Sequence, residues 1–124
     1  MRPYNLFLDD LRTPSMCKHY MYGNYMLYTK MDWIIVKNFN EFIKTIEIKY
    51  QNGYFPSIVS FDHDLADFDM SGSEKTGMDC AKWLINFCMD NNVNLPKYII
   101  HSQNGVGKIN IESILDQYKK FSNE

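Results

Sequence analysis

The sequence has no excess of positive charge and no long apolar run. Thirteen Lys and Arg against fifteen Asp and Glu give a formal net charge of -2, so there is no global positive field to attract long duplex nucleic acid. No apolar stretch approaches the roughly 20 residues of a membrane-spanning helix. The N-terminus reaches Asp9 and Asp10 before a signal-peptide apolar region could form. We expect a cytoplasmic protein that neither spans a membrane nor binds long duplexes.

Cysteine is also scarce, with three residues at positions 17, 80 and 88. Their odd number and the lack of C-x-x-C spacing exclude a disulfide framework and a zinc site. They are expected to be buried thiols in a reducing compartment. The remaining composition, 45% hydrophobic and 15% aromatic over 124 residues, is that of an ordered chain, so residues 1–124 are expected to form a single domain with one core.

Four short runs rich in apolar residues predict buried strands, at 6–8, 33–36, 58–61 and 98–100. Three helical patterns lie between and after them. The first follows Asn38, a predicted N-cap with Glu41 three residues on, and its apolar positions are Phe39, Phe42, Ile43 and Ile46. The second runs over 78–88 and ends in the polar residues 90–92, and the third is expected to begin at Asn110. Gly53 and Pro56 are expected to close the first unit.

Strands that alternate with helices predict a small doubly wound α/β domain with a parallel sheet. Segment 15–31 is the exception, because its Tyr and Met residues show no helical period. It could form a shortened helix or an Ω-like lid, at the place where a first crossover helix would be expected. His19 lies within this segment and is expected at the surface.

Reactive side chains follow three of the four predicted strands. In open α/β sheets, ligands bind beyond the carboxyl ends of the strands, so these side chains should share one crevice. They are Asp9, Asp10 and Arg12 after the first strand, Asp62, His63 and Asp64 after the third, and His101, Ser102 and Asn104 after the fourth. Two histidines beside carboxylates or hydroxyls favour catalysis over a purely structural role.

Two nucleotide or metal motifs fail on inspection. The acidic stretch from Asp62 to Asp69 lacks the glycine and the twelfth-position ligand of an EF-hand. The sequence GVGK at 105–108 lacks the first glycine of a phosphate-binding loop and the Ser or Thr after its Lys. Gly105 and Gly107 still predict a turn ahead of a helix N-terminus, which suits an anion such as phosphate.

Four segments match a known family in order: LFLDDLRTP at 6–14, SFDHDL at 60–65, GMD at 77–79 ahead of Trp83, and HSQNGVG at 101–107. Together they resemble the cyclic-phosphate processing receiver-like domain family over nearly the whole chain. Ala66 stands where the family pattern has Gly, Gly105 where it often has Pro, and the loop 67–76 is longer. The resemblance implies a receiver-like, flavodoxin-like three-layer sandwich that hydrolyses or opens a cyclic phosphodiester. The Lys that phosphorelay needs after the last strand is replaced by His101.

Two mechanisms remain open. In one, His63 and His101 act as base and acid, Asp62 or Asp64 orients them, and no cofactor is needed. In the other, Asp9, Asp10 and Asp62, with Asp64 as a further candidate, hold Mg²⁺ or Mn²⁺, and the histidines remain essential. Both hold the phosphate with a shared set of groups, namely Arg12, Ser102, Asn104, Gly105 and Gly107.

The expected substrate is small. A 2′,3′-cyclic phosphate at an RNA terminus, as in RNA repair, fits the resemblance, and so does a cyclic nucleotide or oligonucleotide signal of the kind that viruses degrade to evade defence. The alternative from a different class is a catalytically inactive receiver-like module that binds or sequesters a phosphorylated or cyclic-nucleotide ligand. An inactive module would return its ligand intact.

Overall fold

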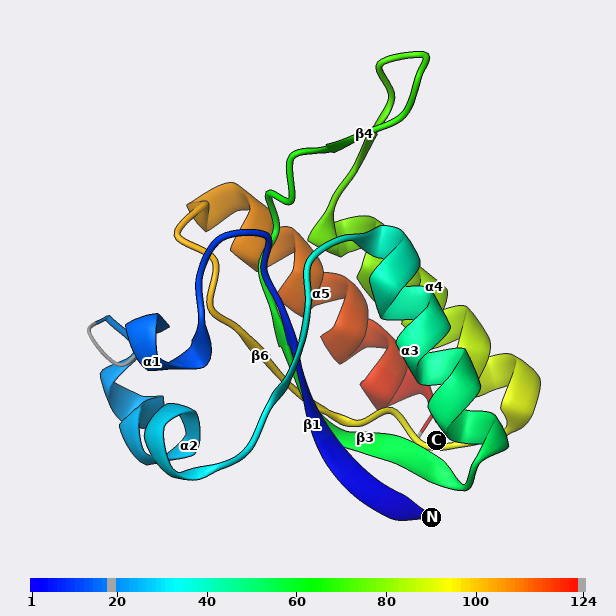
Figure 1. Cartoon of the computed structure of the whole chain (residues 1–124). Helices are drawn as coiled ribbons and strands as arrows, with labels where there is room; N and C mark the ends of the chain where they lie inside the picture. The colour runs from blue at the N-terminus through cyan, green and yellow to red at the C-terminus, as the bar shows by residue number, and fades with distance from the viewer. Residues whose placement is uncertain (18–19, 123–124) are drawn as a thin grey trace.

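Residues 1–17 and 20–122 are described by the computed structural model, without the side chain of Tyr22. Its centre is a four-stranded parallel sheet of β1 (Arg2–Leu8), β2 (Ile34–Val36), β3 (Tyr54–Phe61) and β6 (Lys97–Ile100), in the order β2-β1-β3-β6 (Figure 1). This order corresponds to the first four strands of the flavodoxin-like arrangement 2-1-3-4-5. The predicted doubly wound α/β fold is confirmed.

Three long helices cover one face of this sheet: α3 (Phe39–Gln51), α4 (Gly77–Asn91) and α5 (Gly105–Ser122) (Figure 1). The Asn38 side chain caps α3 by accepting a hydrogen bond from the Glu41 amide at 2.9 Å, as the sequence predicts. A capping box between Thr76 and Asp79 opens α4, and Asn92 ends it in the left-handed conformation. None of the described helices is long and apolar enough to cross a membrane.

The opposite face is covered by much shorter elements. They are α1 (Pro14–Cys17), the 3₁₀ helix η1 (Tyr22–Asn24) and α2 (Tyr25–Lys30). Of the two alternatives for segment 15–31, the described residues form shortened helices, held to the sheet by Cys17 and Tyr28 packed on Phe7. The prediction for His19 lies outside the described residues.

The two faces enclose two apolar clusters. The larger lies under α3, α4 and α5 and includes Phe42, Ile46, Leu84, Ile111 and Leu115. The smaller lies under α2 and consists of Phe7, Cys17 and Tyr28 with partly buried neighbours. All three cysteines are free and buried, as predicted.

Three predictions of local structure are wrong. The third helix begins at Gly105, five residues before the expected N-cap Asn110, because Asn104 caps it instead. The third strand begins at Tyr54 and runs through Pro56, since a bulge in its pairing with β1 accommodates that residue. Ile43, whose place on the apolar stripe of the first predicted helix predicts a core position, is only half-buried, whereas Phe42 and Ile46 are fully buried.

One element was not predicted at all. The chain between β3 and α4 forms a small antiparallel hairpin of β4 (Asp67–Phe68) and β5 (Glu74–Lys75), which projects from the carboxyl end of the sheet (Figure 1). The short strands escape period-based prediction because two residues show no alternation.

Candidate functional site

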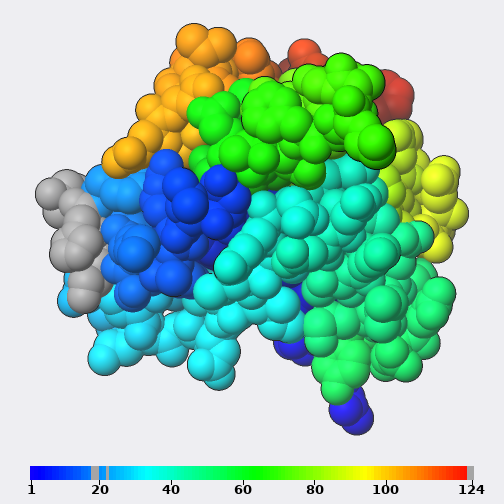
Figure 2. Space-filling model, turned by 45° about the horizontal axis from the view of Figure 1, so that its top comes forward, coloured from blue at the N-terminus to red at the C-terminus, as the bar shows by residue number. Residues whose placement is uncertain are grey.

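Most of the side chains predicted to form a site lie at the carboxyl edge of the sheet. Figure 2 shows this edge from above: the segment after β1 in blue lies beside the green hairpin, with the start of α5 in orange behind them. Strand β3 ends at Phe61, directly before Asp62. Asp9, Asp62 and His101 each offer a ligand atom within 4.8 Å of the others, and all three side chains are buried.

Asp9 is the most constrained of these groups, with 1% of its side chain exposed. Its Oδ1 accepts hydrogen bonds from the amides of Leu11 at 2.9 Å and Arg12 at 2.8 Å, and its Oδ2 lies 3.0 Å from Nε2 of His101. Burial alone would raise the pKa of Asp9, but these hydrogen bonds outweigh it and hold the pKa below its ordinary value. Asp9 is therefore a carboxylate at neutral pH.

The ionised state of Asp9 fixes the tautomer of His101. Because a carboxylate only accepts hydrogen bonds, Nε2 of His101 carries a hydrogen and donates a hydrogen bond to Asp9. Nδ1 then accepts from the Ser60 hydroxyl at 2.7 Å, and Ser60 accepts from Tyr28 at 2.6 Å. Burial raises the pKa of Tyr28, which keeps it a donor. The result is a directed chain of hydrogen bonds from Tyr28 to Asp9.

His101 is also enclosed by apolar side chains. Its ring is fully buried and stacks on Phe7, with ring centroids 4.3 Å apart and planes at 9°. Both of its nitrogens are occupied by protein groups. In this arrangement His101 orients Asp9 and has no free nitrogen to offer a substrate.

The pKa of Asp62 is shifted in the opposite direction. It is 3% exposed, and its Oδ1 accepts a hydrogen bond from the His63 amide at 2.8 Å. Burial, and next the negative charge of Asp9, raise the pKa of Asp62 above its ordinary value. Within the described residues its Oδ2 takes part in no hydrogen bond. A cation beside this oxygen would relieve the repulsion between the two carboxylates.

A cavity of about 370 Å³ opens beside these carboxylates. Among the described residues its ionisable lining consists of one cation and five carboxylic acids, and the cation is Arg12. The acids are Asp9, Asp10, Asp62, Asp64 and Glu74, and the other lining residues are Leu11, Ala66 and Phe68. Arg12 is already engaged, because its guanidinium donates to Tyr20 at 2.7 Å and lies 3.8 Å from Asp9. The cavity is strongly acidic.

His63 belongs to a second cluster, on the side of α5. Its Nδ1 donates to Asp64 at 2.8 Å, because the carboxylate can only accept. Asn104 donates from Nδ2 to Asp64 at 3.1 Å, and its Oδ1 accepts from the Gly107 amide at 3.0 Å. The hydrogen bond from His63, with a weaker one from Asn104, lowers the pKa of Asp64. The His63 side chain is 19% exposed, and Nε2 has no hydrogen-bond partner among the described residues.

Gly107 makes room for the His63 ring. A β-carbon at this position would lie 2.4 Å from Cγ of His63, far inside van der Waals contact. The glycine that suggested a phosphate-binding turn thus seats an imidazole, and its amide is already used by Asn104. Ser102 has a similar internal role, since its hydroxyl accepts from the Asn104 amide at 3.1 Å.

The structure therefore brings some predicted residues together and separates others. Asp9, Asp10, Arg12, Asp62 and Asp64 line one cavity. The two histidines have separate partners: His101 packs among Phe7 and Tyr28 below α2, whereas the His63 ring lies against the first turn of α5. The expected pairing of the two imidazoles is not formed, because the side chains leave their strand ends toward different faces of the sheet.

Several members of the site could not be predicted from sequence. Tyr20 and Tyr28 lie in the aperiodic segment, where no pattern singles them out. Ser60 could be predicted, because it lies on β3 two positions before Asp62, and alternation along an extended chain places such residues on the same side. Phe68 and Glu74 reach the cavity through the hairpin.

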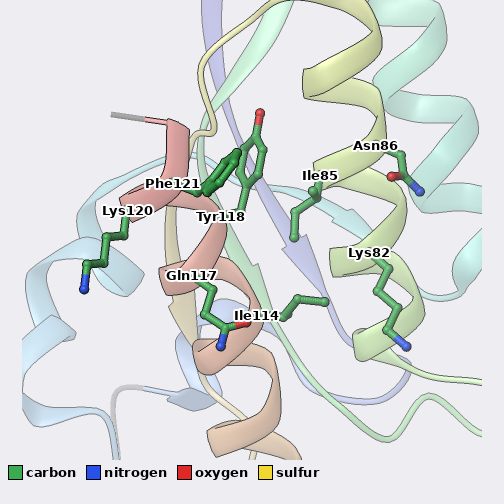
Figure 3. A pocket seen from close by; sticks show the side chains of 8 residues that line it. All are labelled: Lys82, Ile85, Asn86, Ile114, Gln117, Tyr118, Lys120 and Phe121. Atoms are coloured by element: carbon green, nitrogen blue, oxygen red, sulfur yellow. The ribbon is translucent and has the colours of Figure 1, made fainter. Parts of the chain in front are cut away.

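A larger groove of about 660 Å³ lies elsewhere, between α4 and α5 (Figure 3). Its lining is mostly apolar, with side chains such as Ile85, Tyr118 and Phe121 pointing into it. No carboxylate or histidine is among its lining residues within 1–17 and 20–122. The groove has none of the acid–base groups gathered at the sheet edge.

Comparison with solved structures shows the same fold. The chain is similar to the signal receiver domain of a putative Luxo repressor protein from Vibrio parahaemolyticus, with 21% sequence identity and a TM-score of 0.52. The similarity covers 95% of this chain and 73% of that one. A comparison with curated protein sequences gave no match.

Comparison with protein families is more specific. Residues 4–117 match the family described as the cyclic-phosphate processing receiver domain. The match includes all of β2, β3 and β6, β1 from Tyr4 onward, and every described residue that lines the acidic cavity. The chain belongs to the cyclic-phosphate processing receiver domain family.

Proposed function

We propose that this protein hydrolyses a cyclic phosphodiester at the acidic cavity and that a divalent cation is required. The single observation that carries this proposal is the lining of the cavity, whose described residues include five carboxylic acids and only one basic side chain, Arg12. An anionic phosphate would be repelled by such a surface. A bound cation reverses that local charge and allows the phosphate to approach.

The donor set suits Mg²⁺ or Mn²⁺. Both ions prefer carboxylate oxygens, and Asp9, Asp10 and Asp62 are the residues that would hold one. Asp62 fits best, because it combines a buried carboxylate, a raised pKa and an oxygen that no described group satisfies. When bound, the ion would neutralise charge on the phosphoryl oxygens and polarise the phosphorus centre. His101 acts through Asp9, holding that carboxylate in one orientation.

His63 is the group proposed to move protons. Hydrolysis forms a bond between a water oxygen and phosphorus and breaks the bond from phosphorus to one ring oxygen. The water loses a proton and the leaving alkoxide gains one. Nε2 of His63 can accept or deliver a proton, while Asp64 holds Nδ1–H and stabilises the imidazolium. The product is a phosphomonoester with a free hydroxyl.

The remaining polar groups support this pair. Asn104 ties Asp64 to the first turn of α5, so the acid–base pair is fixed to a long helix. Arg12 and the amide of Gly105 are the groups proposed to contact the phosphate. Tyr20 and Asp9 engage Nη1 and Nε of Arg12, and its Nη2 makes no hydrogen bond among the described residues. Ser102, Asn104 and Gly107 use their polar atoms within the protein and are proposed to position the site instead.

The experiment is an incubation of the purified protein with a panel of cyclic phosphates, followed by phosphorus NMR with and without EDTA. The panel contains 2′,3′-cyclic nucleotides, 3′,5′-cyclic nucleotides and an RNA ending in a 2′,3′-cyclic phosphate. We expect one member to convert to a phosphomonoester with Mg²⁺ or Mn²⁺ and to remain intact with EDTA. An intact ligand under every condition would overturn hydrolysis, and perturbed resonances of an intact ligand would favour the binding module.

A further inference from the structure

The hairpin of β4 and β5 brings one aromatic side chain to the lining of the acidic cavity. Phe68 lines this cavity and is 61% exposed. Exposed apolar side chains are common on any protein, so exposure alone carries no argument. The distinguishing feature of Phe68 is its place beside the proposed site of chemistry.

The two faces of the hairpin have different tasks. Asp67 pairs with Lys75, and Phe68 pairs with Glu74, so each pair shares one face of the ribbon. The first pair anchors the hairpin to α3: Asp67 accepts a hydrogen bond from the Phe39 amide at 3.0 Å, and the Lys75 ammonium lies 5.1 Å from the centre of the Phe39 ring. The second pair faces the cavity.

The tip of the hairpin is equally well fixed. Oδ1 of Asp69 accepts hydrogen bonds from the amides of Ser71 and Ser73, at 2.9 and 3.0 Å, and from the Ser71 hydroxyl at 2.7 Å. Gly72 supplies the positive φ of the turn. An aromatic ring on a ribbon held at both ends loses little conformational entropy on binding a ligand.

We propose that Phe68 is the base-stacking residue of the substrate site, so that the substrate is the cyclic phosphate of a nucleoside and not of a base-free sugar or polyol. This inference rests on the proposed function for the position of the phosphate. Every nucleobase presents an apolar face that stacks on an aromatic ring. The cavity of about 370 Å³ lies near the lower end of the range for small-molecule sites, which suits a single nucleotide unit.

The test compares two substrates that differ only in the base. One is a nucleoside 2′,3′-cyclic phosphate, and the other is methyl ribofuranoside 2,3-cyclic phosphate. Phe68→Ala should lower kcat/KM for the nucleotide by about 5- to 150-fold, the effect of losing one stacked base. It should leave kcat/KM for the base-free substrate unchanged. Phe68→Trp should retain the preference for the nucleotide.

Phe121→Ala is the matched control, because Phe121 is another exposed aromatic, 76% exposed and in the groove between α4 and α5. It should change neither rate. Equal losses on both substrates in Phe68→Ala would overturn the inference in favour of a structural role, and no loss on either would overturn it outright. An RNA ending in the same cyclic phosphate is assayed in parallel. Whichever of the RNA and the free nucleoside cyclic phosphate has the higher kcat/KM identifies the source of the nucleotide. Cleavage of both should depend on Phe68.

Failure of the proposed reaction would be distinguishable. If the wild type cleaves neither substrate, calorimetry with the same two compounds and Mg²⁺ measures binding instead. If the wild type binds the nucleoside cyclic phosphate and Phe68→Ala weakens that binding, the base site is supported and the proposed hydrolysis is overturned. Equal affinity for the two compounds, or no binding, would overturn the base site.

Discussion

The two faces of the central sheet are built in different ways. Under α3, α4 and α5 the buried side chains are apolar, with Phe61, Leu84 and Leu115 among them. Under α2 the buried side chains include a chain of hydrogen bonds through Tyr28, Ser60 and His101 that ends at Asp9. One face supplies a core, and the other supplies both a small core and the support of the candidate site.

The difference shows how a short domain can carry a buried polar network. A buried polar group is costly unless its partners are complete. In this network each donor has an acceptor, and the network ends on a carboxylate at the cavity. The long helices opposite provide the apolar burial that a small domain needs. The comparison predicts that substitutions on the two faces affect different properties.

The largest effect is expected from Asp62→Asn on the polar face. This change removes the charge best placed for a divalent cation, so cleavage should fall to the level of the buffer control, as it should on EDTA treatment. Added Mn²⁺ should restore the stripped wild type and not the variant. Phosphorus NMR reads both results, and a variant that retains wild-type cleavage would contradict the role of Asp62.

Asp62→Asn should lower activity but raise the free energy of unfolding relative to the wild type at neutral pH. Burial and the charge of Asp9 raise the pKa of Asp62 in the folded state, so its ionised form disfavours folding. The wild type should therefore lose stability relative to Asp62→Asn as pH rises through that raised pKa. Urea unfolding in EDTA at pH 4 and pH 7 measures this difference. A wild type that gains on the variant with rising pH would contradict the assignment.

Substitution of the two histidines should affect different properties of the protein. His63→Ala should lower cleavage by about 10²–10⁴-fold with little change in the free energy of unfolding, because the ring lies at the edge of the fold. His101→Ala should cost about 2–5 kcal/mol of stability, since it leaves a cavity beside Phe7 and removes partners from Ser60 and Asp9. Urea unfolding and cleavage assays separate the two. Equal destabilisation by both changes would contradict the different roles assigned to His63 and His101.

The apolar face should affect stability alone. Leu84→Ala is expected to cost about 2–5 kcal/mol by opening a cavity under α4, and Ile46→Ala should cost about the same. In conditions where both variants remain folded, cleavage per folded molecule should match the wild type. A specific loss of activity in either variant would show that the two faces are more tightly coupled than the contacts suggest.

The smallest effect is expected at Ala66, which has a φ of +48°, a conformation disfavoured for any residue with a β-carbon. Ala66→Gly relieves that strain but adds flexibility to the unfolded chain. The net change should be a gain of up to about 1 kcal/mol in the free energy of unfolding. Thermal unfolding gives the sign, and a clear loss of stability would mean that the alanine methyl group makes a contact that matters more than the strain.

Much of this comparison could be predicted from the sequence, and the reasons differ by region. The strands and the carboxylates after them follow from short apolar runs that end in Asp9 and Asp62. The capping residues Asn38 and Asn92 mark helix ends because their side chains or backbone conformations suit those positions. Each of these features depends on residues that are close together in the sequence, so the sequence alone predicts it.

The parts that were missed depend on contacts between distant segments. The burial of His101 results from Phe7 and Tyr28, which come from a strand and a short helix far away in the chain. The start of α5 was placed too late because Asn104 is a better cap in three dimensions than its neighbours suggest. The acidity of the cavity needs Glu74, which only the hairpin brings near. The spacing of apolar residues along the sequence does not indicate contacts between such distant segments.

The most direct test of the central claim is a titration of metal-free protein with Mn²⁺. Electron paramagnetic resonance measures the bound ion, and phosphorus NMR of the same samples measures cleavage of a nucleoside 2′,3′-cyclic phosphate. Cleavage should be absent in the metal-free protein and should rise in proportion to bound Mn²⁺, with saturation at one site per chain that Asp62→Asn removes. Full cleavage by the metal-free protein would contradict the central claim.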